Sequence, residues 1–206
     1  DLGEPAAVIL PGSKSVISDL TFVEHSGLGA RIRSLAAEGK SEIVGVCGGY
    51  QMLGRTISDP HGLESETAEM SALGLLPMHT VMDPDKTLTL RQGVHCASGL
   101  PVQGYEIHHG RSRAEGGRPI LRLGQGDDRG LERENGKRPI WGAYLHGLFD
   151  ADDFRRWFID RLRQSKGLQP LGAVQVRYDL EPALDRLADI VREHLDVDRV
   201  KREIGL

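Results

Sequence analysis

The chain has 206 residues, a formal net charge of −4 and two cysteines, Cys47 and Cys96. A chain of this length can bury one sizeable core, and a weak charge without a basic stripe disfavours nucleic-acid binding. No apolar run approaches the ~20 residues needed to span a bilayer, and no signal peptide is recognisable. Because two cysteines do not form a disulfide framework, the sequence favours a cytoplasmic location.

The amino-terminal residues predict a linker, a strand and a tight turn. We interpret residues 1–5 as a linker from a missing amino-terminal domain and residues 6–206 as a single domain. The apolar run Ala7–Leu10 predicts a strand, and Pro11-Gly12-Ser13 predicts the turn after it. The backbone N–H of Ser13 is a candidate oxyanion donor. An ordinary strand-to-helix connection, with the serine as helix cap, explains the turn equally well.

A nucleophile elbow follows the apolar strand predicted over 43–46. Its pattern is Gly45-x-Cys47-x-Gly49, in which glycines permit a sharp turn because side chains would clash and glycine tolerates unusual dihedral angles. The first N–H groups of the following helix, beginning with that of Gly48, favour both a thiolate and an oxyanion. We therefore predict that Cys47 is a nucleophile and not a buried core thiol.

A cysteine nucleophile needs a base, and three histidines are candidates. His146 ends the apolar strand predicted over 140–145 and is the preferred base. His108 and His109 end a second predicted strand, and because adjacent strand residues face opposite sides, only one of them is expected in the cleft. They are rival bases, substrate contacts or a polar strand end. No second pair of ligands at metal spacing accompanies them, so no metal site is predicted.

The other segments complete an alternation of apolar strands and amphipathic helices. A further strand is expected at 119–123, and the segment 116–136 as a whole is expected to form a strand with a hairpin or flexible loop. Helices are expected over 16–37, with breaks at Gly27 and Gly29, and over 150–163. From residue 181 onward we expect a long helix followed by a short one. Such alternation is typical of an α/β fold, here a three-layer αβα architecture with a mostly parallel central sheet. Cys96 lies in a turn-rich stretch and is predicted to be structural or incidental.

Four separated motifs resemble, in order and spacing, a class I glutamine amidotransferase domain of the cobyric acid synthase type. They are Leu10-Pro11-Gly12-Ser13-Lys14, Cys47-Gly48-Gly49-Tyr50-Gln51, Gly104-Tyr105-Glu106-Ile107-His108 and Tyr144-Leu145-His146-Gly147-Leu148-Phe149. The resemblance implies a flavodoxin-like fold. It also implies hydrolysis of L-glutamine to glutamate and ammonia through a thioester on Cys47, with His146 as base.

Further site roles come from the same resemblance. Gln51 resembles the glutamine that contacts the substrate, and Arg91 resembles an arginine that holds the substrate carboxylate, a role that suits its bidentate fork. The local sequence alone favours a solvent-facing helix residue for Gln51 and a solvated strand residue for Arg91. His108 is taken as a third substrate contact, and the backbones of Ser13 and Gly48 as the oxyanion hole.

One position departs from the wider class. Most class I enzymes carry a Glu two residues after the catalytic His, whereas this chain has Leu148 there. The cobyric acid synthase branch is similar in lacking this carboxylate, so the resemblance implies a Cys-His dyad. A less firmly oriented imidazole implies slow glutamine hydrolysis without the partner domain.

The resemblance also implies a partner. The missing amino-terminal domain would be an amidoligase that uses ATP and Mg²⁺ to amidate carboxylates of a corrinoid in cobalamin biosynthesis, while the domain described by this sequence needs no cofactor. Two features favour this branch: the form of residues 11–14 and the carboxyl-terminal tail. In the resembled family this tail packs back on the glutaminase domain. Two alternatives stay open: the glutaminase of a lipid II isoglutaminyl synthase-like cell-wall enzyme, and a non-catalytic binding module on the same fold.

Overall fold

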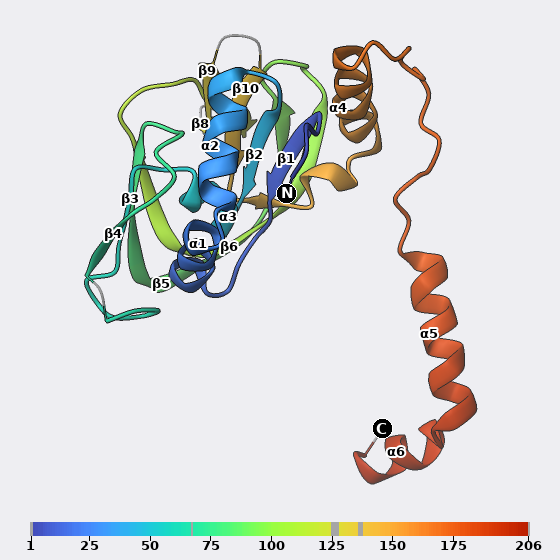
Figure 1. Ribbon diagram of the computed structural model, residues 1–206. Coiled ribbons are helices and arrows are strands. Elements are labelled where there is room, and N and C mark those ends of the chain that lie inside the picture. The colour runs from blue at the N-terminus through green and yellow to red at the C-terminus, as the bar shows by residue number, and fades with distance from the viewer. Residues whose placement is uncertain (1, 67, 125–127, 136–137, 206) are drawn as a thin grey trace. The chain divides into compact units, whose positions relative to one another are not determined.

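The computed structural model describes residues 2–66, 68–124, 128–135 and 138–205 (Figure 1). The chain divides into two units, Asp1–Ala173 and Val174–Leu206, each described by itself. The elements of the first unit are β1 (Ala7–Leu10), α1 (Val16–His25), α2 (Leu28–Glu38), β2 (Glu42–Val46), α3 (Gly48–Met52), β3 (Thr56–Ser58), β4 (Glu69–Ser71), β5 (Met78–His95), β6 (Pro101–Ala114), β7 (Leu121–Leu123), β8 (Asp128–Arg129), β9 (Leu131–Asn135), β10 (Arg138–Ala143), β11 (Leu145–His146), the 3-10 helix η1 (Leu148–Asp150) and α4 (Asp152–Ser165).

A four-stranded sheet forms the centre of the first unit. Its strand order is β1-β2-β10-β9, in which β1, β2 and β10 are parallel and β9 is antiparallel. Side chains alternate between the two faces of a strand. Ile43 of β2 therefore joins a core cluster that contains residues of α1 and α2, whereas Val44 joins a second cluster that contains Phe154 and Phe158 of α4. Helices thus cover both faces of this sheet, as the α/β prediction requires.

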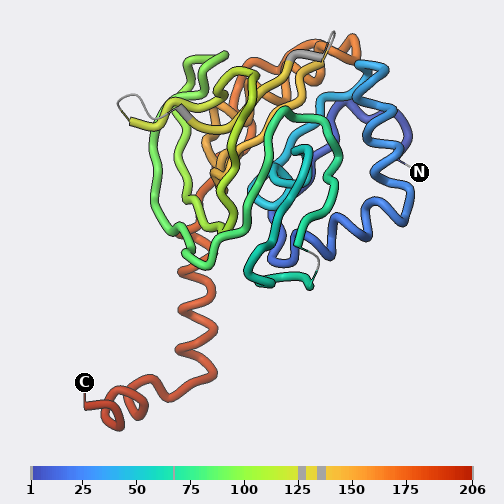
Figure 2. The backbone as a smooth tube through the Cα atoms, turned by 90° about the vertical axis from the view of Figure 1, so that its left-hand side faces the viewer, coloured from blue at the N-terminus to red at the C-terminus, as the bar shows by residue number. Residues whose placement is uncertain are grey.

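A second sheet is built on the long antiparallel pair of β5 and β6. Its main order is β11-β6-β5-β3-β4, and β7 and β8 pair beside β5. The register between β5 and β6 shifts between Met82 and Thr87, where an irregularity, called the bulge below, interrupts the ladder. In Figure 2 the β5–β6 ribbon (green) lies on the left and α1 and α2 (blue) lie on the right. The α/β class is confirmed, and this largely antiparallel sheet is added to the parallel one.

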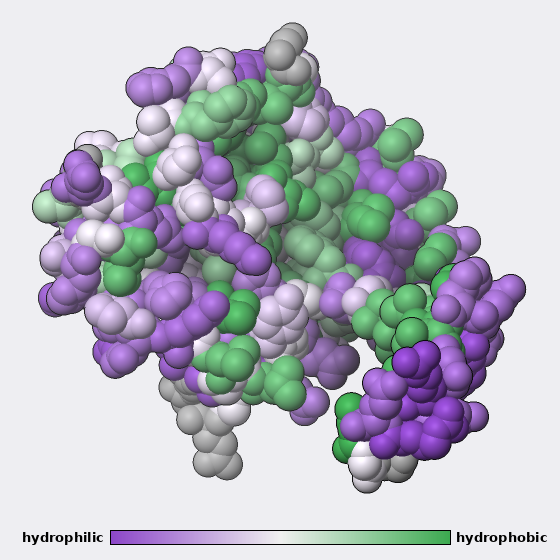
Figure 3. All heavy atoms as spheres, turned by 90° about the horizontal axis from the view of Figure 1, so that it is seen from below, coloured by the Kyte–Doolittle hydropathy of each residue, from purple (hydrophilic) through white to green (hydrophobic). Residues whose placement is uncertain are grey.

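Some apolar side chains stay on the surface of the first unit. Leu88 and Leu90 on β5 are 72% and 85% exposed. Figure 3 shows apolar areas (green) between polar ones (purple) on the face seen from below. Exposed apolar residues are common on protein surfaces.

The predicted elements can be compared one by one with the structure. The helical region over 16–37 does break into α1 and α2, with Gly27 in the left-handed region at φ 80°. The expected strand over 140–145 is two strands, because β10 ends at Ala143 and β11 begins at Leu145 in the other sheet. The segment 116–136 contains β7, β8 and the whole of β9, while residues 125–127 and 136 lie outside the described residues.

The second unit contains the long helix and the short helix expected from residue 181 onward. These are α5 (Glu181–His194) and α6 (Val197–Glu203), and the Asp196 carboxylate caps α6 by accepting a hydrogen bond from the Arg199 N–H at 2.9 Å. None of the helices in the described part of the chain is long and apolar enough to cross a membrane. The expected packing of this tail on the glutaminase domain stays a prediction.

Candidate active site

The backbone strain of the elbow is carried by the cysteine itself. Cys47 lies between β2 and α3 with φ 51° and ψ −109°, and among the described residues it is the one non-glycine residue with a positive φ. A residue in such a sparsely populated region costs on the order of 1–3 kcal/mol and persists only where the surroundings enforce it. The N–H of Cys47 donates to the Ala143 carbonyl at 2.8 Å, which ties the elbow to the end of β10.

The glycines around Cys47 are needed for space. A Cβ on Gly49 would stand 2.1 Å from the Leu10 carbonyl oxygen, and one on Gly45 would stand 2.7 Å from the Tyr50 backbone. The predicted clash is therefore confirmed at both positions. The expectation of unusual dihedral angles was wrong for these glycines, since neither has a positive φ. The strand and the helix pack so closely that they force the unusual angles onto the cysteine.

Of the two predicted oxyanion donors, the Gly48 N–H lies beside the thiol, and Ser13 lines the same cavity as Cys47. The Gly48 N–H donates toward the Cys47 sulfur and opposes part of the increase that burial causes in the pKa of this thiol. A Cβ on Gly48 would stand 2.8 Å from the Ser13 nitrogen, which brings the turn after β1 against the start of α3. The Ser13 side chain does not cap α1. Its hydroxyl accepts from the Ser15 N–H at 2.9 Å, whereas the Glu64 carboxylate accepts from the Ile17 N–H at 3.1 Å.

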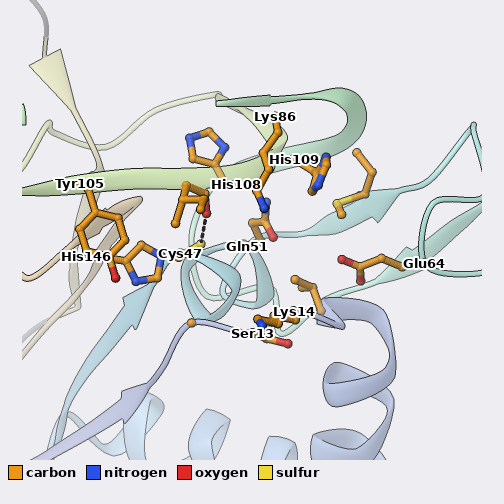
Figure 4. Close-up of a pocket in the computed structure, with 14 residues that line it drawn as sticks. Ser13, Lys14, Cys47, Gln51, Glu64, Lys86, Tyr105, His108, His109 and His146 are labelled. Carbon is orange, nitrogen blue, oxygen red and sulfur yellow. Dashed lines mark hydrogen bonds between the residues drawn. The ribbon is translucent and has the colours of Figure 1, made fainter. Parts of the chain in front are cut away.

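The thiol and the imidazole are both neutral in the resting site. Burial raises the pKa of the Cys47 thiol above its ordinary value, and the Gly48 N–H only partly offsets this effect. Burial likewise lowers the pKa of His146. The thiol donates to the Ile107 carbonyl with a sulfur–oxygen distance of 3.4 Å, shown dashed in Figure 4. The site is therefore at rest with its proton still on sulfur.

His146 lies next to Cys47, as predicted for the base. A Cβ on Gly12 would stand 2.8 Å from His146 Cε1 and 3.7 Å from Cys47 Cβ, so both residues border the same small space. Figure 4 shows the imidazole between the Tyr105 ring and the cysteine. The rings of Tyr105 and His146 are stacked, with centroids 5.0 Å apart and planes 7° apart. The break between β10 and β11 carries the histidine to this place.

His108 and His109 both line the cavity, which corrects the expectation that only one of them would. His109 faces the bulge of β5, where strict alternation is lost, and its Nδ1 lies 3.2 Å from the Asp83 carbonyl. His108 Nδ1 lies 2.7 Å from the Gly110 carbonyl, an acceptor only, so Nδ1 carries the proton. Burial lowers the pKa of His108 and keeps the ring neutral, stacked on Tyr144.

Of the two side chains that the resemblance predicts to contact substrate, Gln51 lines the cavity and Arg91 does not. Gln51 is buried at 2% exposure and lines the cavity, and its Nε2 donates to the Tyr144 hydroxyl at 3.2 Å. Its local interpretation as a solvent-facing residue was therefore wrong. Arg91 is not among the described residues that line the cavity. Its Nε lies 3.4 Å from a carboxylate oxygen of the buried Glu106.

Several lining residues were missed from the sequence. The cavity, with a volume of about 680 Å³, is also bordered by Lys14, Lys86, Glu64 and Tyr105. Two cations and one carboxylate suit a zwitterion that carries both a carboxylate and an ammonium group. Lys14 and Tyr105 could have been found from the sequence, because each lies inside one of the four family motifs. The sequence offered no such indication for Lys86 and Glu64. Among the described residues no group of three His, Cys, Asp or Glu could hold a metal ion.

Leu148, at the place of the usual orienting carboxylate, is packed in the core and not in the site. It is 2% exposed and belongs to the cluster that contains Phe154 and Phe158. Its side chain cannot accept a hydrogen bond from the imidazole. The described site thus contains a thiol and an imidazole, without a carboxylate at position 148.

The fold and this site define a class of proteins, the class I glutamine amidotransferases. A crystal structure of a glutamine amidotransferase is similar with a TM-score of 0.55 and 18% identity, covering 79% of this chain and 80% of that one. A putative GMP synthase subunit from Thermoplasma acidophilum is similar with a TM-score of 0.51 and 13% identity, covering 81% and 77%. At such identities the two structures show the fold alone.

The chain belongs to the CobB/CobQ-like glutamine amidotransferase domain family, whose sequence model matches residues 1–154. It is 44% identical over its whole length to an adenosylcobalamin biosynthesis bifunctional protein CobDQ of Leptospira interrogans, of which it covers 24%. It is 45% identical over 98% of its length to a cobyric acid synthase of Geobacillus thermodenitrificans, of which it covers 40%. The chain therefore spans less than half of these relatives.

Proposed function

We propose that this domain hydrolyses L-glutamine to glutamate and ammonia, with Cys47 as nucleophile and His146 as base. The observation that carries the proposal is the strained elbow, with Cys47 at φ 51°, beside a histidine on the wall of the same cavity. A core cysteine would need neither the strain nor the neighbouring base. The cavity volume of about 680 Å³ is ample for one amino acid.

The reaction begins when the thiol proton moves to His146. The sulfur then attacks the amide carbon of glutamine, and the negative charge on the amide oxygen is stabilised by the N–H groups of Gly48 and Ser13. His146 returns its proton to the amide nitrogen, the C–N bond breaks and ammonia leaves, which produces a thioester on Cys47. A water molecule then gives a proton to His146 and attacks the thioester, which releases glutamate and restores the thiol.

Activation requires the thiol to turn away from its resting acceptor. The hydrogen bond to the Ile107 carbonyl and the burial of both groups favour the neutral pair over an ion pair. Bound substrate would place its amide carbonyl against the Gly48 N–H, which would stabilise the negative charge that develops on the carbonyl oxygen. This arrangement supports slow turnover in the isolated domain.

The α-carboxylate and the α-ammonium group of glutamine find complementary charges on the cavity wall. Lys14 and Lys86 supply cations and Glu64 supplies an anion, while Gln51 and His108 provide polar contacts nearer the thiol. Because the guanidinium of Arg91 lies against Glu106, we assign it to positioning that carboxylate and not to the substrate.

The ammonia would pass to an ATP- and Mg²⁺-dependent amidoligase domain that amidates corrinoid carboxylates in cobalamin biosynthesis. The supporting observation is that both longer relatives are named for this pathway, as cobyric acid synthase and as an adenosylcobalamin biosynthesis protein. A cell-wall acceptor has no such support, since no named relative above points to it. The ATP, metal and corrinoid sites would lie in that other domain.

The test compares Cys47→Ser with Cys96→Ser, a matched control at the exposed second cysteine. Glutamate release from glutamine should vanish in the first variant and stay within twofold of the unaltered chain in the second. A diazoketone analogue of glutamine should add mass to a peptide that contains Cys47. Retention of glutaminase activity in Cys47→Ser would exclude this residue as nucleophile. In a full-length protein the same variant should still amidate a corrinoid acid when ammonium replaces glutamine; failure there would count against ammonia transfer.

A further inference from the structure

One nitrogen of the His146 imidazole has no hydrogen bond to orient the ring within the described part of the chain. Its Nε2 is buried and has no hydrogen-bond partner among the described residues. Leu148 packs into the core in place of the carboxylate that fixes the ring in most class I relatives. A base that can rotate about two side-chain bonds loses the alignment that proton transfer needs. Some other contact must therefore hold the ring.

Tyr105 provides a flat surface for this ring. His146 of β11 and Tyr105 of β6 are directly opposite each other in an antiparallel pair, so their side chains lie on the same face. The ring centroids are 5.0 Å apart and the planes differ by 7°. This geometry lies within the range of offset-stacked aromatic pairs. Figure 4 shows the tyrosine on the side of the imidazole away from the thiol.

Two glycines complete a slot around the imidazole. A Cβ on Gly104 would stand 1.8 Å from the His146 carbonyl oxygen, so a glycine is required for β11 to approach β6 this closely. A Cβ on Gly12 would stand 2.8 Å from His146 Cε1, so the turn after β1 borders the ring edge. The ring is restrained at one face by Tyr105 and at its edge by Gly12, with the cysteine next to it.

We propose that Tyr105 is a positioning residue for His146 and takes over, by stacking, the orienting role of the absent carboxylate. This inference rests on the proposed function, in which His146 is the base. Stacking fixes the plane of the ring and leaves both nitrogens free of a competing acceptor. The hydroxyl group of Tyr105 has no part in this role, which makes the aromatic ring itself the feature to test.

The test uses the full chain and three variants. Tyr105→Leu removes the flat ring, Tyr105→Phe keeps it, and Gln103→Leu is the matched control at an exposed position two residues earlier on the same strand. Since misplacing a catalytic group by about 1 Å can cost ~10²-fold in rate, kcat for glutamate release should fall about 10- to 100-fold in Tyr105→Leu. The Phe and Gln103 variants should stay within twofold, and KM should change little in all three.

Two further readouts separate positioning from general damage. In the unaltered chain and in Tyr105→Phe, ring-current shifts should move the His146 ring protons upfield in an NMR spectrum, and Tyr105→Leu should lose this shift. The absence of the shift in the unaltered chain would overturn the proposal even if the Leu variant failed to fold. A raised KM with unchanged kcat in Tyr105→Leu would also overturn it and assign Tyr105 to substrate contact instead.

His146→Ala, assayed in parallel, distinguishes failure of this inference from failure of the proposed function. An inactive His146→Ala with a normal Tyr105→Leu refutes the positioning role alone. An active His146→Ala refutes the base assignment, and with it the reason for positioning the ring.

Discussion

Replacing Leu148 with glutamate would restore the carboxylate that most class I relatives have, and we expect the change to be harmful. Leu148 is 2% exposed in the cluster around Phe154 and Phe158. Losing its burial costs roughly 1.5–3 kcal/mol, and burying an unpaired polar group costs roughly 1–3 kcal/mol more. The free energy of unfolding should therefore fall by about 2.5–6 kcal/mol, a large part of the ~5–15 kcal/mol typical of a domain.

The loss should depend on pH in a definite direction. A carboxyl group buried among aromatic rings has a pKa above its unfolded value near ~4.3. The folded state then binds more protons than the unfolded state above that value, so stability falls as pH rises through this window and recovers in acid. Denaturant unfolding of Leu148→Glu and of its neutral counterpart Leu148→Gln should differ at pH 7.5 and converge toward pH 4.

Glutamate release measures the catalytic side of the same perturbation. We expect no gain in Leu148→Glu, because the imidazole is already held by the Tyr105 ring and the new carboxylate would have to leave a packed position to reach it. The midpoint of thermal unfolding should drop by on the order of 10 °C. A stable variant that releases glutamate clearly faster than the unaltered chain would refute this reasoning and show that the site is a degraded triad.

Two further predictions concern the base. His146→Ala should reduce kcat for glutamate release by at least the ~10²- to 10⁴-fold typical of general acid–base catalysis, whereas His108→Ala and His109→Ala should each lose less; a larger defect in His108→Ala would reverse the assignment. Because burial lowers the pKa of His146, the base stays neutral to lower pH than a free histidine. The acid limb of kcat/KM should therefore have its midpoint below 6.5, and a midpoint above 6.5 would indicate a stabilised imidazolium in place of the neutral pair.

The elbow could be predicted from the sequence because its chemistry is local. Gly45 and Gly49 stand at fixed offsets from Cys47. The clashes that require them involve β1, the parallel neighbour of β2, and α3, the helix that follows β2. Even there, the angle at Cys47 itself was not anticipated. Which residue bears the strain depends on how tightly strand and helix pack, and spacing alone does not contain this information.

The substrate side of the site could be predicted only in part: Gln51 and His108 do line the cavity, but the other contacts depend on the register of distant strands. Arg91 is opposite Gly104 and its guanidinium reaches Glu106, a pairing set by the β5–β6 ladder. The bulge after Met82 places both His109 and Lys86 on the cavity. A one-residue change of register would move each of these side chains to the other face. No pattern within a single strand reveals such a register.

The switch of the chain from one sheet to the other at Tyr144 has a consequence for how activity is lost. Cys47 follows a strand of the parallel sheet, and His146 belongs to a strand of the antiparallel one. The thiol and the imidazole therefore lie on opposite sides of the boundary between the two sheets. The Tyr144 hydroxyl connects the two sides through hydrogen bonds with Gln51 of α3 and Ser112 of β6. We expect small displacements between the two sheets to separate the thiol from the imidazole before either sheet unfolds. Catalysis is thus a more sensitive gauge of inter-sheet packing than any probe of secondary structure.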